Sequence, residues 1–277
     1  MTETSVTIPK IEITRHNLRR RILQVDRCET LTPRMRRIVF TGDDLEADFP
    51  HYPMAISDHV KIMFPNPGTG ELIVPEIADN RMAIDPQKPA PTFRDYTVRD
   101  FDPKSKELTI DFVLHAHGVA GQWATKAVPG DQVGVLGPRG SKHYPADYPW
   151  YVLGGDETAL PAIARWIEEL PASARGVAII EVPSADEVQE LTGDAGIEVR
   201  YLHRDGKPSR LENAIRAIEL PDTNYFVWMA GEAGMLRPIR RYFRKELELP
   251  AQRAEFDGYW KVGTVNLDHH APDEDDA

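Results

Sequence analysis

Cysteine is almost absent from this chain of 277 residues, which contains one, Cys28. A single cysteine excludes an intramolecular disulfide, a zinc site built on cysteines and an iron–sulfur cluster held by the protein. Long apolar runs are also lacking. Runs such as 225–230 are far shorter than the roughly 20 residues of a membrane-spanning helix. The first ten residues hold Glu3 and Pro9 and no apolar core, so we expect no signal peptide and a cytoplasmic protein.

Basic residues are outnumbered by acidic ones, 33 against 44, which gives a net charge of −11 and disfavours nucleic acid as a partner. Basic residues do cluster, at 15–21 and at 237–245. We interpret both clusters as solvated faces, with docking of an acidic protein as the alternative. The hydrophobic fraction of 41% and charged fraction of 28% are typical of a globular protein, and the length predicts about two domains.

The first half of the chain predicts an antiparallel β-barrel. Short β-branched runs alternate there with turn residues, a pattern typical of barrels and sandwiches. We expect strands at 21–26, 35–40, 59–64, 93–99, 107–113 and 132–136, and a loop at the proline-rich segment 75–92.

From residue 150 the pattern alternates between strand and helix, which predicts a doubly wound parallel α/β domain. The expected strands are 150–153, 177–182, 198–202 and 225–230, and the expected helices are 159–170, 185–191, 210–219 and 236–248. The sequence therefore predicts a two-domain β plus α/β protein. We divide it into a barrel domain at 1–147, an α/β domain at 148–263 and an acidic, disordered tail at 264–277.

Two glycine-bearing turns follow strands of the predicted α/β domain, at Gly155–Thr158 and Gly231–Ala233. Open α/β sheets bind ligands beyond the carboxyl ends of their strands, where helix N-termini attract phosphate, so the two turns together favour a dinucleotide. Glu181 ends another strand, as does the acidic residue that binds a ribose hydroxyl in NAD proteins. No arginine follows it at 182–188, which slightly favours NADH, while Arg204 keeps NADPH open.

The barrel half carries a second group of candidate binding residues. Alternation places Arg94 and Tyr96 on one face of their strand, where an arginine suits a pyrophosphate and a tyrosine an aromatic ring. The hydroxyl of Thr97 can reach a ring nitrogen. Segment 111–124 predicts a strand, a glycine turn and a helix start. Its two histidines lack a third metal ligand nearby, so we expect no metal there.

The segment Arg94–Thr97 resembles the Arg-x-Tyr-Ser/Thr flavin motif of the ferredoxin–NADP reductase superfamily. From about residue 21 to 263 the chain resembles the siderophore-interacting proteins, the flavin-dependent ferric-siderophore reductases. The segments that carry this resemblance are 31–35, 58–61, 94–99, 111–124, 129–131, 155–161, 230–232 and 258–261. It implies FAD on the barrel and NADH or NADPH on the second domain. A hydride would reach the flavin, and Fe(III) would then take single electrons.

The resemblance also implies site residues. The expected FAD contacts are Arg94, Asp95, Tyr96, Thr97, Val113, His115, His117, Gly118, Val119, Ala120, Gly121, Gln122, Trp123 and Ala124. The expected NAD(P)H contacts are Gly155, Asp156, Glu157, Thr158, Gly231, Glu232 and Ala233. Lys61 and Lys261 would attract an anionic ferric siderophore, with ordinary surface charge as the alternative. The turn at 118–124 is shorter than is usual in the family, which leaves its phosphate contacts open. Tyr259 or Trp260 would cover the flavin ring, or simply pack in the core.

Two other functions remain open at this point. One is a reductase that passes electrons to a small ferredoxin or flavodoxin, and the other is a siderophore-binding protein without redox activity. A hydrolase is disfavoured because the chain has no Gly-x-Ser-x-Gly motif. The sequence leaves open the siderophore type, the choice between NADH and NADPH, and whether the protein is a monomer or a weak homodimer.

Overall fold

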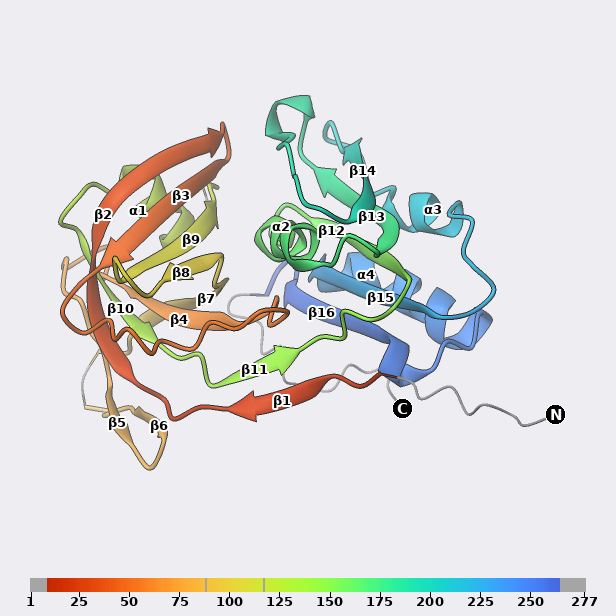
Figure 1. Ribbon diagram of the computed structural model, residues 1–277. Helices are drawn as coiled ribbons and strands as arrows, with labels where there is room; N and C mark the ends of the chain where they lie inside the picture. Colours follow the sequence, from red (N-terminus) through yellow and green to blue (C-terminus); the bar gives the residue numbers. More distant parts are fainter. Residues whose placement is uncertain (1–8, 88, 117, 265–277) are drawn as a thin grey trace. The chain divides into compact units, whose positions relative to one another are not determined.

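The computed structural model describes residues 9–87, 89–116 and 118–264 (Figure 1). The chain divides into two compact units. Of the described residues, those within 13–143 form one unit, and those within 144–264 form the other together with 9–12. Within the described residues no helix is long and apolar enough to span a membrane.

The unit 13–143 is built on a seven-stranded antiparallel sheet in the order β7-β4-β10-β2-β3-β9-β8 (Figure 1). Its strands are β2 (Arg20–Thr32), β3 (Met35–Thr41), β4 (His59–Phe64), β7 (Thr92–Thr97), β8 (Asp100–Asp102), β9 (Glu107–Val113) and β10 (Gln132–Leu136). Only Val98 and Arg99 separate the two edge strands β7 and β8, so the sheet curls into a half-barrel. This confirms the antiparallel architecture predicted for the first half of the chain.

The predicted loop at 75–92 is wrong in part, because it contains the hairpin of β5 (Glu76–Ala78) and β6 (Arg81–Ala83). Asp79 and Asn80 connect the two strands with φ angles of 50° and 57°. Asp and Asn tolerate this left-handed conformation, which two-residue hairpin turns require. A second ribbon, absent from the prediction, pairs β1 (Glu12–Arg15) with β11 (Gly140–His143).

Alternate residues of the half-barrel strands fill its core, which α1 (Val119–Lys126) closes. The indole of Trp123 on this helix stacks on Phe40 at 6.3 Å between ring centroids and lies 5.2 Å from the ring of Phe64. Burial of such aromatic side chains contributes about 1.5–3 kcal/mol each. The helix is therefore fixed by its apolar face, on which Ala120, Gly121 and Ala124 are buried.

The second unit is a five-stranded parallel sheet in the order β14-β13-β12-β15-β16 (Figure 1). Its strands are β12 (Trp150–Asp156), β13 (Arg175–Val182), β14 (Gly196–His203), β15 (Tyr225–Glu232) and β16 (Ala254–Trp260). Helix α2 (Leu160–Glu169) packs Trp166 against Tyr151 and Trp228 on one face. Helices α3 (Leu211–Arg216) and α4 (Ala233–Arg241) cover the other face. Helices on both faces of a parallel sheet confirm the doubly wound prediction.

Some predicted helices differ from the structure. The one expected at 185–191 is a single 3-10 turn, Ala185–Glu187. The N–H of Gln189 donates to the hydroxyl of Tyr201 at 3.4 Å, whereas a helix would direct this donor to the carbonyl of Ala185. The helix expected at 236–248 begins earlier, as α4, and ends in a π-helical turn, Tyr242–Glu246. Strand β16, which the prediction missed, completes the sheet.

Candidate cofactor sites

The N-terminus of α1 is open. Its N-cap is Gly118, and among the described residues no side chain caps the first turn. The backbone N–H groups of a first helical turn have no acceptors within the helix. A Cβ atom on Gly121 would lie 2.9 Å from the carbonyl oxygen of His115 and 3.0 Å from its backbone nitrogen. Only glycine permits this close approach of the chain. Open N–H groups at a helix start beside glycines fit the diphosphate of a dinucleotide.

At the C-terminal end of α1, Arg36 provides hydrogen-bond donors to the carbonyl groups that have no partner within the helix. Its Nη1 donates to the carbonyls of Ala124 and Thr125 at 2.7 and 2.9 Å, and its Nη2 donates to that of Ala127 at 3.0 Å. A guanidinium at a helix C-terminus complements the negative end of the helix dipole. No sequence pattern singled out this residue.

Arg94, Tyr96 and Thr97 follow one another along β7, as predicted from the motif. The Arg94 guanidinium donates to the carbonyl of Phe93 at 2.6 Å and has no ion pair within the part of the chain that the structure describes. The Tyr96 ring lies 4.4 Å from that of Phe112, and burial raises the pKa of its hydroxyl, against the opposing charge of Arg94. A cation without a carboxylate, an aromatic ring and a hydroxyl thus lie on one strand.

The opposite face of the same strand holds Asp95, which pairs with Lys61 on β4. The lysine Nζ donates to Oδ1 and Oδ2 of Asp95 at 2.8 and 2.9 Å and lies 5.1 Å above the ring of Phe93. Asp95, which was predicted to contact FAD, therefore binds Lys61 in this structure. Its carboxylate neutralises the charge of that lysine. Val113 ends β9 and is half-buried. His117 lies outside the described residues.

At the carboxyl edge of the parallel sheet, Asp156 joins the two glycine turns. Its Oδ1 accepts bonds from the backbone N–H and hydroxyl of Thr158 at 2.9 and 2.5 Å. Its Oδ2 accepts from the N–H of Glu232 at 2.8 Å and the indole Nε1 of Trp260 at 2.9 Å. The side chain is 1% exposed, and this burial raises its pKa while the bonds from Thr158 oppose the shift. A Cβ on Gly231 would lie 2.7 Å from Oδ2, so glycine is required there.

Glu232 also bonds to its own chain. Its Oε2 accepts the backbone N–H of Met235 at 2.6 Å and caps α4, and its Oε1 accepts the N–H of Val262 at 3.1 Å. The predicted contacts Asp156 and Glu232 thus hold the turns in place.

Three further residues named in the sequence analysis, Arg204, Glu157 and Glu181, meet at the same edge. Arg204 follows β14 and binds both carboxylate oxygens of Glu157, which is half-buried and follows Asp156 in the chain. Burial and the charge of Asp156 raise the pKa of Glu157, and Arg204 opposes them. Glu181 is 1% exposed and accepts the N–H of Arg210 at 2.7 Å. Its carboxylate therefore fixes the loop that follows β14.

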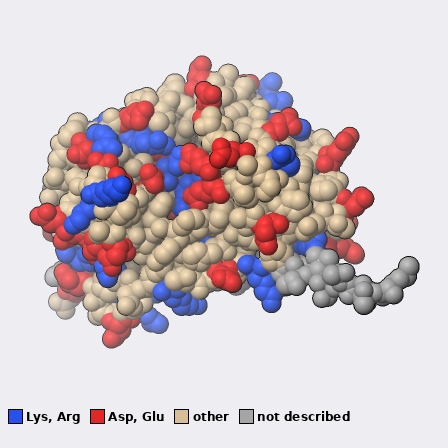
Figure 2. Space-filling view, viewed as in Figure 1, with Lys and Arg blue, Asp and Glu red and all other residues tan. Residues whose placement is uncertain are grey.

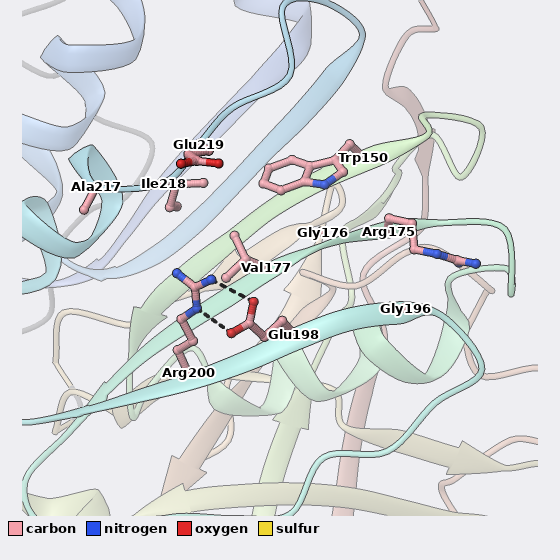
Figure 3. A pocket seen from close by; sticks show the side chains of 10 residues that line it. All are labelled: Trp150, Arg175, Gly176, Val177, Gly196, Glu198, Arg200, Ala217, Ile218 and Glu219. Atoms are coloured by element: carbon pink, nitrogen blue, oxygen red, sulfur yellow. Dashed lines mark hydrogen bonds and ion pairs between the residues drawn. The ribbon is translucent and has the colours of Figure 1, made fainter.

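A separate hollow of about 500 Å³ lies at the other edge of this sheet, at the amino ends of β12, β13 and β14 (Figure 3). Trp150 lines it, and Arg200 and Glu198 pair with each other there at 2.8 and 2.7 Å. None of the predicted site residues lines it. Among the described residues no three His, Cys, Asp or Glu side chains gather as metal ligands.

The basic cluster at 237–245 is largely engaged with its own unit. Arg240 donates to the carbonyl of Phe256 at 3.2 Å, and Arg244 donates to those of Leu249, Ala251 and Ala254. On the face drawn in Figure 2, acidic and basic side chains are interspersed.

Known proteins resemble this chain along most of its length. It is 31% identical over 257 residues to the ferric vibriobactin reductase ViuB of Vibrio cholerae, with 90% of this chain and 92% of the relative covered. It is 32% identical to the NADPH-dependent ferric-chelate reductase of Escherichia coli, with 89% and 94% covered. The chain belongs to the siderophore-interacting protein family. The family's own model matches residues 148–263, and the model of the siderophore-interacting FAD-binding domain matches 24–142.

Solved structures of siderophore-interacting proteins share the fold. A siderophore utilization protein from T. fusca superimposes with a TM-score of 0.88 at 45% identity, covering 95% of this chain and 100% of that one. Phthalate dioxygenase reductase, at 13% identity and a TM-score of 0.61, shares the two-domain reductase fold. The predicted family and fold are confirmed.

Proposed function

We propose that this chain is a ferric-siderophore reductase that uses FAD and a nicotinamide dinucleotide. The observation that carries the proposal is the site on the first unit. An open helix N-terminus, the close approach at Gly121, and Arg94, which has no carboxylate partner among the residues that the structure describes, together suit a flavin dinucleotide. Relatives named as ferric vibriobactin, ferric-chelate and ferric acinetobactin reductases support the substrate class.

The residues of the first unit divide the binding work. Backbone N–H groups of the first turn of α1 bind the diphosphate, and Arg94 binds a phosphate oxygen. The ring of Tyr96 packs on the isoalloxazine, and the hydroxyl of Thr97 donates to a ring nitrogen. Bound FAD supplies the link between a two-electron nicotinamide donor and Fe(III), which accepts one electron at a time.

On the second unit, the turns 155–158 and 231–233 bind NADH or NADPH through their backbone N–H groups. Asp156 and Glu232 keep these turns in place. Lys61 and Lys261 attract the anionic ferric chelate. No side chain acts as acid or base. Iron leaves after reduction because hard oxygen ligands hold Fe(II) more weakly than Fe(III).

The experiment is one anaerobic absorbance titration of the purified holoprotein. NADH or NADPH is added first, and a ferric siderophore follows together with a chelator that traps Fe(II). We expect the flavin band to bleach with the nicotinamide, then to recover as trapped Fe(II) accumulates. Bleaching without recovery would contradict the siderophore as acceptor, and absence of flavin would contradict the cofactor site.

A matched pair of variants tests the flavin site itself. Gly121→Ala places a methyl group against the backbone of His115 and should lower FAD affinity at least about tenfold, because the helix start must shift. In Gly68→Ala the new Cβ meets only the Asn66 side chain at 3.4 Å, so FAD affinity should stay unchanged. Equal FAD affinity in both variants would contradict the assignment.

A further inference from the structure

The segment that follows β16 is anchored on both sides of Lys261. Before it, the indole of Trp260 donates to Oδ2 of Asp156 at 2.9 Å. After it, the N–H of Val262 donates to Oε1 of Glu232 at 3.1 Å. The N–H of Thr264 also donates to the carbonyl of Lys261 at 3.0 Å, which closes a turn over 261–264.

The two anchoring carboxylates are themselves fixed. Asp156 is 1% exposed and accepts three more hydrogen bonds, from Thr158 and from the N–H of Glu232. Glu232 caps α4 through Met235, so its carboxylate is held at the start of that helix. Both anchors therefore belong to the ordered edge of the sheet.

Lys261 is exposed and has no ion pair among the described residues. Lys61 differs, because Asp95 already compensates its charge. A cation on an ordered main chain binds an anion at a smaller cost in conformational entropy than one on a free segment.

We propose that Asp156 and Glu232 are positioning residues that hold Lys261 in place for an anionic ferric chelate. This inference rests on the proposed function. Neither carboxylate touches the chelate. Their hydrogen bonds are made to protein donors, which neutralises part of their charge and limits repulsion of an anionic ligand near Lys261.

The test removes one anchor by deleting a single backbone N–H. Val262 is the second residue of the turn 261–264, a position where proline is well tolerated. Val262→Pro removes the donor that Glu232 accepts, and Val262→Ala keeps it while removing the exposed side chain. For an anionic ferric tris-catecholate, Val262→Pro should raise KM about 3- to 10-fold, the size expected for one lost hydrogen bond. Val262→Ala should change KM less than about twofold.

The positioning role is separated from general destabilisation by a double-mutant cycle. In a Lys261→Ala background, Val262→Pro should raise KM no further, because the anchor acts through the lysine. Adding Val262→Pro should change neither the rate of flavin reduction by the nicotinamide nor KM for a neutral ferric trihydroxamate, whether residue 261 is lysine or alanine. Trp260→Phe, which removes the indole donor and keeps a ring, should act in the same direction.

Two results would overturn the inference while ferric reduction persists. One is an additive effect of Val262→Pro in the Lys261→Ala background. The other is an unchanged KM for the anionic chelate in Val262→Pro or in Lys261→Ala alone. If the wild-type holoprotein reduced no ferric siderophore at all, the proposed function itself would be overturned.

Discussion

The Nη2 atom of Arg204 lies 2.6 Å from both Oε1 and Oε2 of Glu157, and its Nη1 atom lies 3.8 Å from Oε2 of Glu181. The cation at the carboxyl end of β14 therefore already faces two carboxylates. The expected NAD(P)H contacts themselves include no arginine or lysine. A 2′-phosphate would have to compete with Glu157 for this guanidinium.

Weakening the pair should move the enzyme toward NADPH. In Glu157→Gln the arginine loses its charged partner and can bind the 2′-phosphate, so kcat/KM for NADPH relative to NADH should rise about 3- to 10-fold. Steady-state kinetics with both dinucleotides measure the ratio. Glu190→Gln, an exposed site with the same charge change, is the control. An unchanged ratio in Glu157→Gln would show that Arg204 does not approach the 2′-phosphate.

From the pairing of Lys61 with Asp95 we expect that mutation of Asp95 increases the affinity for an anionic ferric chelate. Asp95→Asn leaves the lysine without its carboxylate, so KM for an anionic ferric chelate should fall about threefold, and Lys61→Ala should raise it. Flavin content, measured by absorbance, checks that the cofactor is retained. A neutral ferric chelate should respond to neither change. Equal responses to charged and neutral chelates would contradict a role for Lys61 charge.

Arg21 and Glu46 predict an acid-sensitive contribution to stability. Burial would raise the pKa of Glu46, but the hydrogen bond and charge of Arg21, which is 1% exposed, together with a backbone hydrogen bond and one from Arg19, hold this pKa below the ordinary 4.5. The stabilisation is therefore complete above pH 4.5 and is lost as pH falls through the lowered pKa. Glu46→Gln should lower the free energy of unfolding by ~1.5–3 kcal/mol at neutral pH.

Urea denaturation of the wild type and Glu46→Gln at pH 7 and at about pH 3 measures this. The difference between the two proteins should shrink at the lower pH. A difference that is the same at both pH values would mean that the ionised form of Glu46 contributes nothing.

The strands of both units were largely predictable because each segment's own sequence shows either an alternation of apolar residues or an apolar run. The run 59–64, for example, is β4 to the residue. Strand β16 was missed because Gly258 and alternating acidic residues dilute its pattern, and only pairing with β15 reveals it. The hairpin at 76–83 was hidden by the surrounding prolines.

The site was predictable in its locations and less so in its side-chain roles. The sequence indicated that Asp156 and Glu232 belong to neighbouring turns. Asp156, however, bonds to the N–H of Glu232, 76 residues away, and to Trp260, 104 residues away. Whether a carboxylate faces a ligand or its own chain depends on such distant contacts, which no local pattern encodes. The same holds for Arg36, which reaches α1 from β3.

By covering three carbonyls at one end of α1, Arg36 cancels one pole of that helix and leaves the other uncovered. The N-terminal end of α1 therefore keeps its positive electrostatic potential, which acts over a distance of about one helical turn. Because this potential acts only at short range, it favours a compact anion in direct contact with the helix end over negative charge farther away. A protein with a net charge of −11 can in this way hold an anionic cofactor without gathering a field of cations around it.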